Sequence, residues 1–336
     1  MFSLFFTSCS SDFKVGADYK DITAVYALLA RSDTANYIKI SKGFYSETIN
    51  NLIIAQVADS LYYNNIEVKL YEMNNANIVK TFVLPRVELH AEGFIKNSGT
   101  FADTPSYAYK HKAILDASKT YRLEIKNLSN GKVITGETGI INDDNMIFSA
   151  PGATGRLNFS DPSQDFNFQW NSPTGAVFYD LYMRFHYEEK NTNTNIVERK
   201  FVDLPLSRNV PPTGVFASSA VKGVDFFKIL NSGLGAAPSY ISRYVDTPDL
   251  FLYGGGQELK TYIDVNAAQG GITADQIKPN YSNLMVDGVR GKDVFGIFST
   301  RAQRFRLEVP FTNATVDSII KGSYTKNLNI VGVSPN

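Results

Sequence analysis

The only cysteine of this 336-residue chain ends the run Phe6-Thr7-Ser8-Cys9. An apolar residue three positions before a cysteine, with small residues between them, is the lipobox pattern: a signal peptidase cuts before the cysteine, whose sulfur is then acylated. The alternative is a buried thiol, since free cysteine is among the most buried residue types. The polar run that follows, Ser10–Lys14, has no core pattern. The sequence therefore predicts Cys9 as a lipidation site.

Residues 1–19 are interpreted as a truncated lipoprotein signal and tether. A secretory signal has a positive first region and then about 7–15 apolar residues, whereas only Met1, Phe2 and Ser3 precede Leu4. We therefore expect the true start to lie upstream of Met1. A cysteine carrying several acyl chains anchors far better than one chain does. We expect an outer-membrane location, facing the periplasm or the cell surface, with the membrane reached through the lipid on Cys9.

Other residues that could perform chemistry are sparse. The three histidines, His90, His111 and His186, have no metal-ligand spacing, and no nucleophile-elbow, phosphate-loop or zinc-protease motif occurs. The oxygen-rich run Asn142–Asn145 lacks the spaced pattern of a Ca²⁺ loop and is interpreted as a turn. We expect no enzyme activity, no metal and no cofactor. A hydrolase stays open as an alternative, and its available carboxylates are Asp161, Asp165 and Asp180.

Aromatic residues suggest a binding function, because they make up 13% of the chain. Phe and the single Trp170 are usual core anchors, whereas a tyrosine pairs an apolar ring with a polar tip. The tyrosines that we predict as ligand-binding, with a polysaccharide as ligand, are Tyr62, Tyr63, Tyr107, Tyr109 and Tyr182. Three short acceptor patterns for O-glycosylation also occur, at Asp33-Thr34, Asp59-Ser60 and Asp317-Ser318.

Composition narrows the possible partners. The chain has 33 lysines plus arginines and 33 aspartates plus glutamates. This balance argues against a nucleic-acid partner and against a polybasic membrane surface. No apolar run reaches the roughly 20 residues that a membrane span needs.

Strand patterns dominate residues 20–150, which are predicted to form an immunoglobulin-like β-sandwich. Residues 36–42 alternate apolar and polar side chains with period two. Two hairpins are expected: one joins strands at 66–71 and 78–84, and the other turns at Asn130-Gly131, a dipeptide typical of tight hairpin turns. The apolar segment 52–58 fits a strand or a short helix. A Pro/Gly-rich stretch, Ser149–Gly155, marks the expected domain boundary.

Residues 151–336 are predicted to form a second β-rich domain with one packed helix. A long hairpin is expected from 176–188 and 196–206, with Leu181, Met183 and Phe185 on one face and Tyr182, Arg184 and His186 on the other. Apolar residues at three- and four-residue spacing predict a helix over 214–230. Further strands are expected at 249–253, 259–265, 294–299 and 304–309, and the last twenty-odd residues are weakly patterned. The fold class predicted for the whole chain is mainly β.

The order of these features resembles the Bacteroidota-type envelope lipoproteins whose globular part is a domain of unknown function. Besides Cys9, the resemblance rests on five short segments: 59–63, 225–230, 254–259, 281–284 and 296–301. It implies an envelope location and a β-rich fold, but no reaction. We therefore expect a non-enzymatic lipoprotein that acts as an interaction or structural module, with an envelope protein or a polysaccharide as partner. The alternative is a polysaccharide-binding accessory protein of an outer-membrane uptake system, which clustered exposed aromatics on one sheet face would favour.

Overall fold

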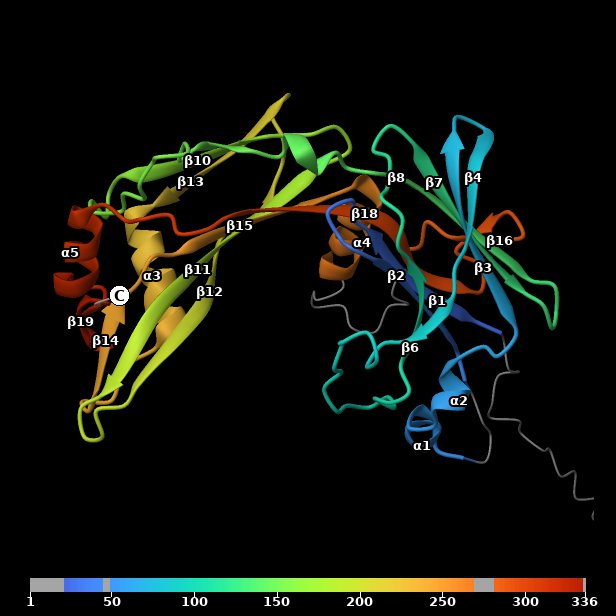
Figure 1. Cartoon of the computed structure of the whole chain (residues 1–336), viewed down its shortest axis with the longest axis horizontal. Coiled ribbons are helices and arrows are strands. Elements are labelled where there is room, and N and C mark those ends of the chain that lie inside the picture. Colours follow the sequence, from blue (N-terminus) through green and yellow to red (C-terminus); the bar gives the residue numbers. More distant parts are fainter. Residues whose placement is uncertain (1–20, 45–48, 269–280, 335–336) are drawn as a thin grey trace, which may run out of the picture.

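The computed structural model describes residues 21–44, 49–268 and 281–334, so Cys9 lies outside the described residues. The fold is mainly β, as predicted, and it has the outline of an arch with two halves (Figure 1). Among the described helices, none is long and apolar enough to cross a membrane.

A single 10-stranded sheet runs through both halves. In spatial order its strands are β19 (Ile330–Val333), β14 (Ile241–Val245), β11 (Phe178–Asn191), β15 (Asp249–Gly255), β18 (Val294–Arg306), β1 (Thr23–Leu29), β2 (Asn36–Lys42), β6 (Tyr107–His111) and β5 (Arg86–Glu88), with β12 (Val197–Val210) paired to β11. β18 joins the halves, because it pairs in parallel with β1 and antiparallel with β15.

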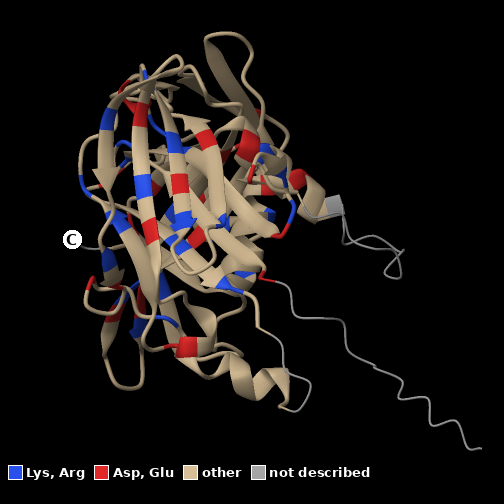
Figure 2. Cartoon of the chain, turned by 90° about the vertical axis from the view of Figure 1, so that its right-hand side faces the viewer, with Lys and Arg blue, Asp and Glu red and all other residues tan. Residues whose placement is uncertain are grey.

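In the first half, this sheet packs against a six-stranded sheet. The strands of the second sheet, in order, are β17 (Val289–Arg290), β16 (Met285–Val286), β8 (Val133–Gly139), β7 (Thr120–Asn127), β3 (Ile66–Asn74) and β4 (Asn77–Val83). Apolar residues from both sheets, among them Val25, Ile38, Leu70, Leu123 and Phe298, form one buried core, the first core. The first half is therefore a β-sandwich, and both predicted hairpins are present in it. Basic and acidic residues are interspersed along its strands (Figure 2).

In the second half, the large sheet is covered by a three-stranded sheet and two helices. These elements are β13 (Phe216–Lys222), β10 (Asp165–Asn171), β9 (Phe148–Ala150), α3 (Gly223–Leu234) and α5 (Asn313–Lys321). Trp170, Phe185, Phe226 and Leu252 are fully buried among them in the second core. The remaining short elements are α1 (Asn51–Ala55), α2 (Ala58–Leu61), α4 (Gln257–Ala268) and the 3₁₀ turns η1 (Asp143–Asn145) and η2 (Lys326–Leu328).

The predicted helix over 214–230 is wrong in its first half. The helix α3 begins only at Gly223, and β13 precedes it. Ala217 and Val221 are buried while Phe216 is 41% exposed. This alternation of buried and exposed residues is that of a strand, which pairs with β10, and not that of a helix with one buried face. The helical spacing of the apolar residues was therefore coincidental over 216–222.

Three other expectations also need correction. The predicted strand over 259–265 is part of α4, which lies against β18. The predicted strands at 294–299 and 304–309 are largely one long strand, β18. The last residues carry α5 and β19, whose apolar residues Ile319 and Ile330 join the second core. In each case, pairing within the large sheet or packing against it decided the local structure.

Candidate binding face

Side chains of four neighbouring strands, β12, β11, β15 and β18, share the outer face of the large sheet in the second half. In the antiparallel register Tyr182 lies opposite Phe251, and Phe251 lies opposite Phe305. Directly opposed residues of antiparallel strands present their side chains on the same face. The other face of β11 and β15 is buried, because Leu181, Met183, Phe185, Leu250 and Leu252 belong to the second core. We call the outer surface the ring face, and its members are Tyr182, Arg184, Phe201, Phe251, Tyr253 and Phe305.

The ring face has one row that crosses all four strands and consists of three rings with Arg184 between two of them. The guanidinium carbon of Arg184 lies 4.1 Å from the ring centre of Phe201 and 4.9 Å from that of Phe251. The rings of Phe251 and Phe305 meet edge to face at 5.1 Å. Phe201 is 56% exposed and Phe305 is 44% exposed. Cation–π and edge-to-face contacts of this kind fix the rings in place while their outer surfaces stay accessible.

A second row lies beside the first and contains the predicted residue Tyr182. Its ring meets that of Tyr253 edge to face at 5.9 Å, and the guanidinium carbon of Arg208 lies 5.7 Å from the Tyr182 ring centre. Tyr253 is 39% exposed. Partial burial raises the pKa of the Tyr253 hydroxyl, so it stays protonated and able to donate a hydrogen bond at neutral pH.

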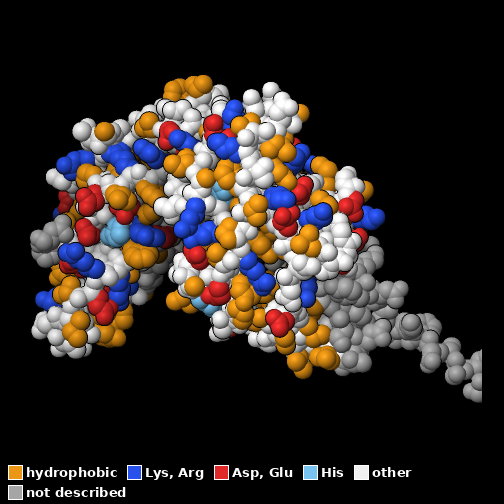
Figure 3. Space-filling view, turned by 45° about the vertical axis from the view of Figure 1, so that its right-hand side comes forward, with side chains coloured by type: hydrophobic (Ala, Val, Ile, Leu, Met, Phe, Trp, Pro, Cys, Tyr) orange, Lys and Arg blue, Asp and Glu red, His pale blue; other side chains and the backbone are white. Residues whose placement is uncertain are grey.

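Charged groups on the ring face are largely paired. Arg184 binds Asp203 through two hydrogen bonds, of 2.7 Å from Nε and 2.8 Å from Nη2. This contact holds the pKa of Asp203 below its usual range. His186 Nε2 lies 2.8 Å from the Asp249 carboxylate. The ring face therefore combines exposed rings and hydrogen-bonding groups with little net charge. Figure 3 shows hydrophobic, basic, acidic and histidine side chains next to one another on the smaller lobe.

The other predicted tyrosines lie in the first half, away from Tyr182. Tyr62 and Tyr107 are brought together: their rings meet edge to face at 5.2 Å, and the Arg86 guanidinium lies 3.7 Å from the Tyr107 ring centre. Tyr62 and Tyr109 are only 5% and 7% exposed. Burial also raises the pKa of the Tyr109 hydroxyl. These rings therefore offer a ligand much less surface than the ring face does.

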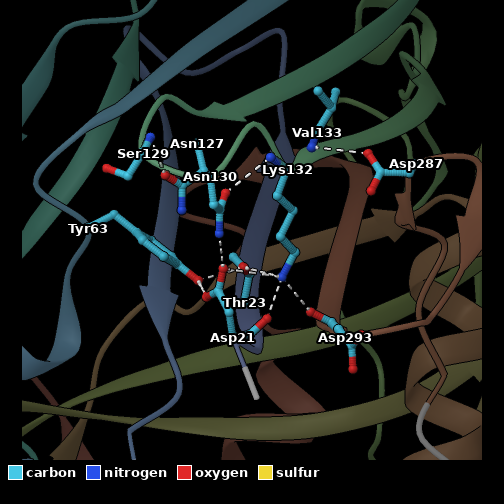
Figure 4. Close-up of polar contacts among 10 residues, drawn as sticks. All are labelled: Asp21, Thr23, Tyr63, Asn127, Ser129, Asn130, Lys132, Val133, Asp287 and Asp293. Carbon is cyan, nitrogen blue, oxygen red and sulfur yellow. Dashed lines mark hydrogen bonds and ion pairs between the residues drawn. The ribbon is translucent and has the colours of Figure 1, made fainter. Parts of the chain in front are cut away.

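Tyr63 belongs to a polar cluster that fixes the chain at Asp21 (Figure 4). The Tyr63 hydroxyl donates to the Asp21 carboxylate at 2.5 Å, and Asn130 Nδ2 donates to its other oxygen at 3.0 Å. Lys132 Nζ donates to the backbone oxygens of Asp21 and Asp293, at 2.5 and 3.1 Å. The side chain of Lys132 is 12% exposed, so its charge is largely shielded from water. The cluster ties Asp21, where the described chain begins just before β1, to the turn between β7 and β8.

An open cavity of about 1080 Å³, lined by polar and aliphatic side chains in similar measure, lies between the halves. Its lining includes Arg31, Lys119, Glu137 and Glu258, but no aromatic ring among the described lining residues. Arg31 forms ion pairs with Asp143 and Asp144 of η1, so the predicted turn at 142–145 is held by a cation of the protein itself. The cavity could accept a small hydrophilic molecule, but it does not provide the stacking surfaces of the ring face.

Two of the three candidate hydrolase carboxylates are engaged in local hydrogen bonds. Asp161 accepts hydrogen bonds from the amide and hydroxyl of Ser163, and Asp180 accepts from the amide of Asn209. Asp165 is exposed at the start of β10, opposite Lys222. Within the described ranges, no group of three or more His, Cys, Asp or Glu side chains is placed to hold a metal ion. None of these contacts assembles the three aspartates into one site.

The three predicted glycosylation hydroxyls differ in their surroundings. Ser60 donates to the oxygens of Ile54 and Val57, and Ser318 donates to those of Ser160 and Ala314. Thr34 is exposed in the turn between β1 and β2. Attachment at Ser60 or Ser318 would require these hydrogen bonds to break.

A comparison of the chain with models of known protein families and with curated proteins finds no match.

Proposed function

We propose that this chain is a non-enzymatic lipoprotein of the cell envelope that acts as an interaction module. It is held at the outer membrane through a lipid on Cys9, faces the periplasm or the cell surface, and binds its partner on the ring face. The ring face carries the proposal, because it is a partly exposed aromatic surface on rigid, paired strands that no described element covers. Surfaces of this composition are typical of binding sites, where aromatic side chains and arginine supply most of the affinity.

The lipid anchor is tested by metabolic labelling with palmitate in the cells that produce the protein. We expect label in the wild-type protein and none in Cys9→Ser, because the acyl groups attach at that sulfur. The Cys9→Ser protein should also leave the membrane fraction. An unlabelled wild-type protein would overturn the envelope anchor.

A polysaccharide is the second candidate partner, and the double row of rings on one sheet face favours it. A sugar ring has an apolar face that stacks on an aromatic ring and hydroxyls that pair with polar groups at the edge. Tyr182 and Tyr253 supply the rings, while Arg184 and Asp203 supply donors and acceptors. Because the Arg184–Asp203 and His186–Asp249 charges are paired, a neutral glycan fits better than an acidic one.

Calorimetric titration with soluble glucan, mannan and xylan tests this second candidate. We expect at least one glycan to bind, and the double variant Tyr182→Ala, Tyr253→Ala to bind at least tenfold more weakly. Tyr240→Ala is the matched control, since Tyr240 is 45% exposed and lies outside the ring face. If the wild type binds no glycan, or if Tyr240→Ala loses as much affinity as the double variant, the polysaccharide assignment is wrong.

A further inference from the structure

A second exposed apolar surface lies at the far end of the first half, around α1 and the segment between β5 and β6. Its aliphatic members Leu52, Ile53 and Ile95 are 63%, 62% and 86% exposed. Monomeric proteins rarely expose contiguous apolar patches of this kind without a binding role. We call this surface the apolar end, and its members are Ile49, Leu52, Ile53, Val57, Phe94, Ile95 and Phe101.

Backbone and side-chain contacts hold the two segments of the apolar end together. The amide of Ala102 donates to the oxygen of Ala55 at 2.8 Å. The Gln56 side chain donates to the oxygens of Gly99 and Thr100, at 2.9 and 2.7 Å. Figure 1 places α1 and the segment between β5 and β6 at the same end of the molecule, and Figure 3 shows hydrophobic side chains along that lower edge. The exposed residues therefore belong to one surface.

The charge of the apolar end differs from that of the rest of the chain. Residues 49–57 and 93–102 contain no aspartate or glutamate, and their only charged residue is Lys96. Among the described residues, the carboxylates that flank these ranges are Asp59, Glu92 and Asp103, of which Glu92 is paired with Lys110. The ammonium of Lys96 donates to the backbone oxygens of Phe101 and Ala102, at 3.1 and 3.0 Å, which fixes it beside the exposed rings. Anionic lipid headgroups attract lysine and repel carboxylates, and apolar side chains enter the layer just below them. The apolar end has this composition.

The position of the first described residues, next to the segment that leads to α1, also points to a membrane. The amide of Gly43 donates to the oxygen of Ile22 at 2.7 Å, so the start of the described chain lies beside the segment that leads to α1. Cys9 precedes Ile22 by 13 positions. A fully extended chain of that length spans about 45 Å at most. A lipid on Cys9 would therefore keep the apolar end within reach of the same membrane.

From these observations we infer that the apolar end is a second membrane contact, which rests in the headgroup region beside the lipid anchor. This inference rests on the proposed envelope anchor. Insertion of Leu52, Ile53 and Ile95 binds the surface reversibly by itself, and the tether raises their effective concentration there. The anchor would then hold the protein in a defined orientation instead of letting it turn freely.

The experiment measures co-sedimentation of the full chain carrying Cys9→Ser with vesicles of phosphatidylethanolamine and phosphatidylglycerol. Removing the sulfur separates this contact from the acyl anchor. We expect the Cys9→Ser protein to sediment with vesicles, and addition of Leu52→Glu and Ile95→Glu to lower the bound fraction at least fivefold. Ile114→Glu with Ile196→Glu is the matched control, since these side chains are 82% and 59% exposed outside the apolar end. That pair should leave binding unchanged.

Three results would overturn the inference. The first is a Cys9→Ser protein that stays in the supernatant. The second is an equal loss of binding in both glutamate pairs. The third is a dimer in light scattering that only Leu52→Glu with Ile95→Glu dissociates, which would assign the surface to a second copy of the chain. Failure of palmitate labelling with vesicle binding retained would instead overturn the anchor alone. Circular dichroism of each variant checks that the fold is kept.

Discussion

The ring face and the apolar end both expose apolar side chains, but they are built differently. On the ring face, each aromatic row contacts an arginine, Arg184 or Arg208, and the strands beneath lie on a large core. At the apolar end, aliphatic side chains project from a five-residue helix and a loop, over a small cluster whose buried members are Leu61, Tyr62 and Ala102. The first arrangement fixes the geometry of stacked rings and paired charges, whereas the second presents aliphatic side chains over a small core.

This difference suggests two kinds of partner. A specific ligand requires rings and hydrogen-bonding groups held in place before it binds, because ordering them afterwards reduces affinity. A lipid surface is fluid and adapts to the protein, so exposed aliphatic area and an absence of carboxylates are sufficient. Short helices and loops with few buried contacts also open more easily than central strands do. The predictions below test whether the two regions differ in rigidity as this reasoning requires.

The largest effect is expected at Gly296, where β18 pairs in parallel with β1. Its φ is +94°, and a Cβ there would lie 2.0 Å from the backbone oxygen of Val25. Gly296→Ala should therefore lower the free energy of unfolding by more than about 4 kcal/mol, because β18 cannot move without disturbing both cores. Urea denaturation measures this loss.

Gly93, near the apolar end, is the matched control. Its φ is +91°, but a Cβ there would meet nothing within 4 Å. Gly93→Ala should lower the free energy of unfolding by only about 1–2 kcal/mol, the backbone cost of a left-handed conformation. Equal losses in Gly93→Ala and Gly296→Ala would contradict the expected contrast in rigidity.

The role of β18 marks the limit of what the sequence could predict about the fold. Local hairpins were predictable, because alternation and an Asn-Gly turn place both strands within a few residues of each other. The parallel pairing of β1 with β18 joins residues such as Leu29 and Thr300, which are 271 positions apart. Nothing local in either strand encodes that partner. The strand predicted over Leu259–Val265 is wrong for a related reason, since this segment is helical and packs against β18.

The candidate site was predictable to a similar degree. The alternation in β11 correctly placed Tyr182 and Arg184 on the face opposite Leu181 and Met183. For Phe251 and Phe305, the sequence predicts only that each belongs to a strand, and these two strands are predicted separately. Their alignment beside Tyr182 depends on the register between β11, β15 and β18, and that register follows from the packing of the whole second core.

A smaller effect is expected from the buried ion pair behind the ring face. Glu189 accepts hydrogen bonds from Arg243 Nε at 2.9 Å and from Lys200 Nζ at 2.5 Å, and the Arg243 side chain is only 7% exposed. Glu189→Gln leaves that guanidinium without its carboxylate and should cost about 3 kcal/mol. Asp317→Asn breaks an exposed pair with Lys321 and should cost less than about 0.5 kcal/mol. Thermal or urea unfolding of both variants measures the contrast.

The Glu189 effect should depend on pH with a defined sign. Burial alone would raise the pKa of Glu189, but the hydrogen bonds from Lys200 and Arg243 outweigh burial and lower it. A carboxylate whose pKa is lowered on folding stabilises the protein above its unfolded pKa, about 4.3. The difference between wild type and Glu189→Gln should therefore be full at pH 7 and shrink as the pH falls below about 4. A difference that grows on acidification would contradict the ion pair.

The smallest effect on stability is expected at Arg184, where the consequence for binding should be larger. The Arg184–Asp203 pair is partly exposed, so Arg184→Met should cost less than about 1 kcal/mol at pH 7. The pKa of Asp203 is lowered mainly by Arg184, so the small loss should fade as the pH falls through that lowered value. A double-mutant cycle with Asp203→Asn measures the coupling in urea unfolding.

Ligand affinity on the ring face should respond to the same substitution. Arg184 separates the rings of Phe201 and Phe251, and methionine keeps its apolar stem without the planar cation. If the ring face binds its partner in a preformed geometry, Arg184→Met should weaken binding several-fold while leaving the fold intact. Vesicle binding of the Cys9→Ser chain should not change, because the apolar end depends on aliphatic area and not on ring geometry. Loss of vesicle binding in Arg184→Met would show that the two surfaces do not act separately.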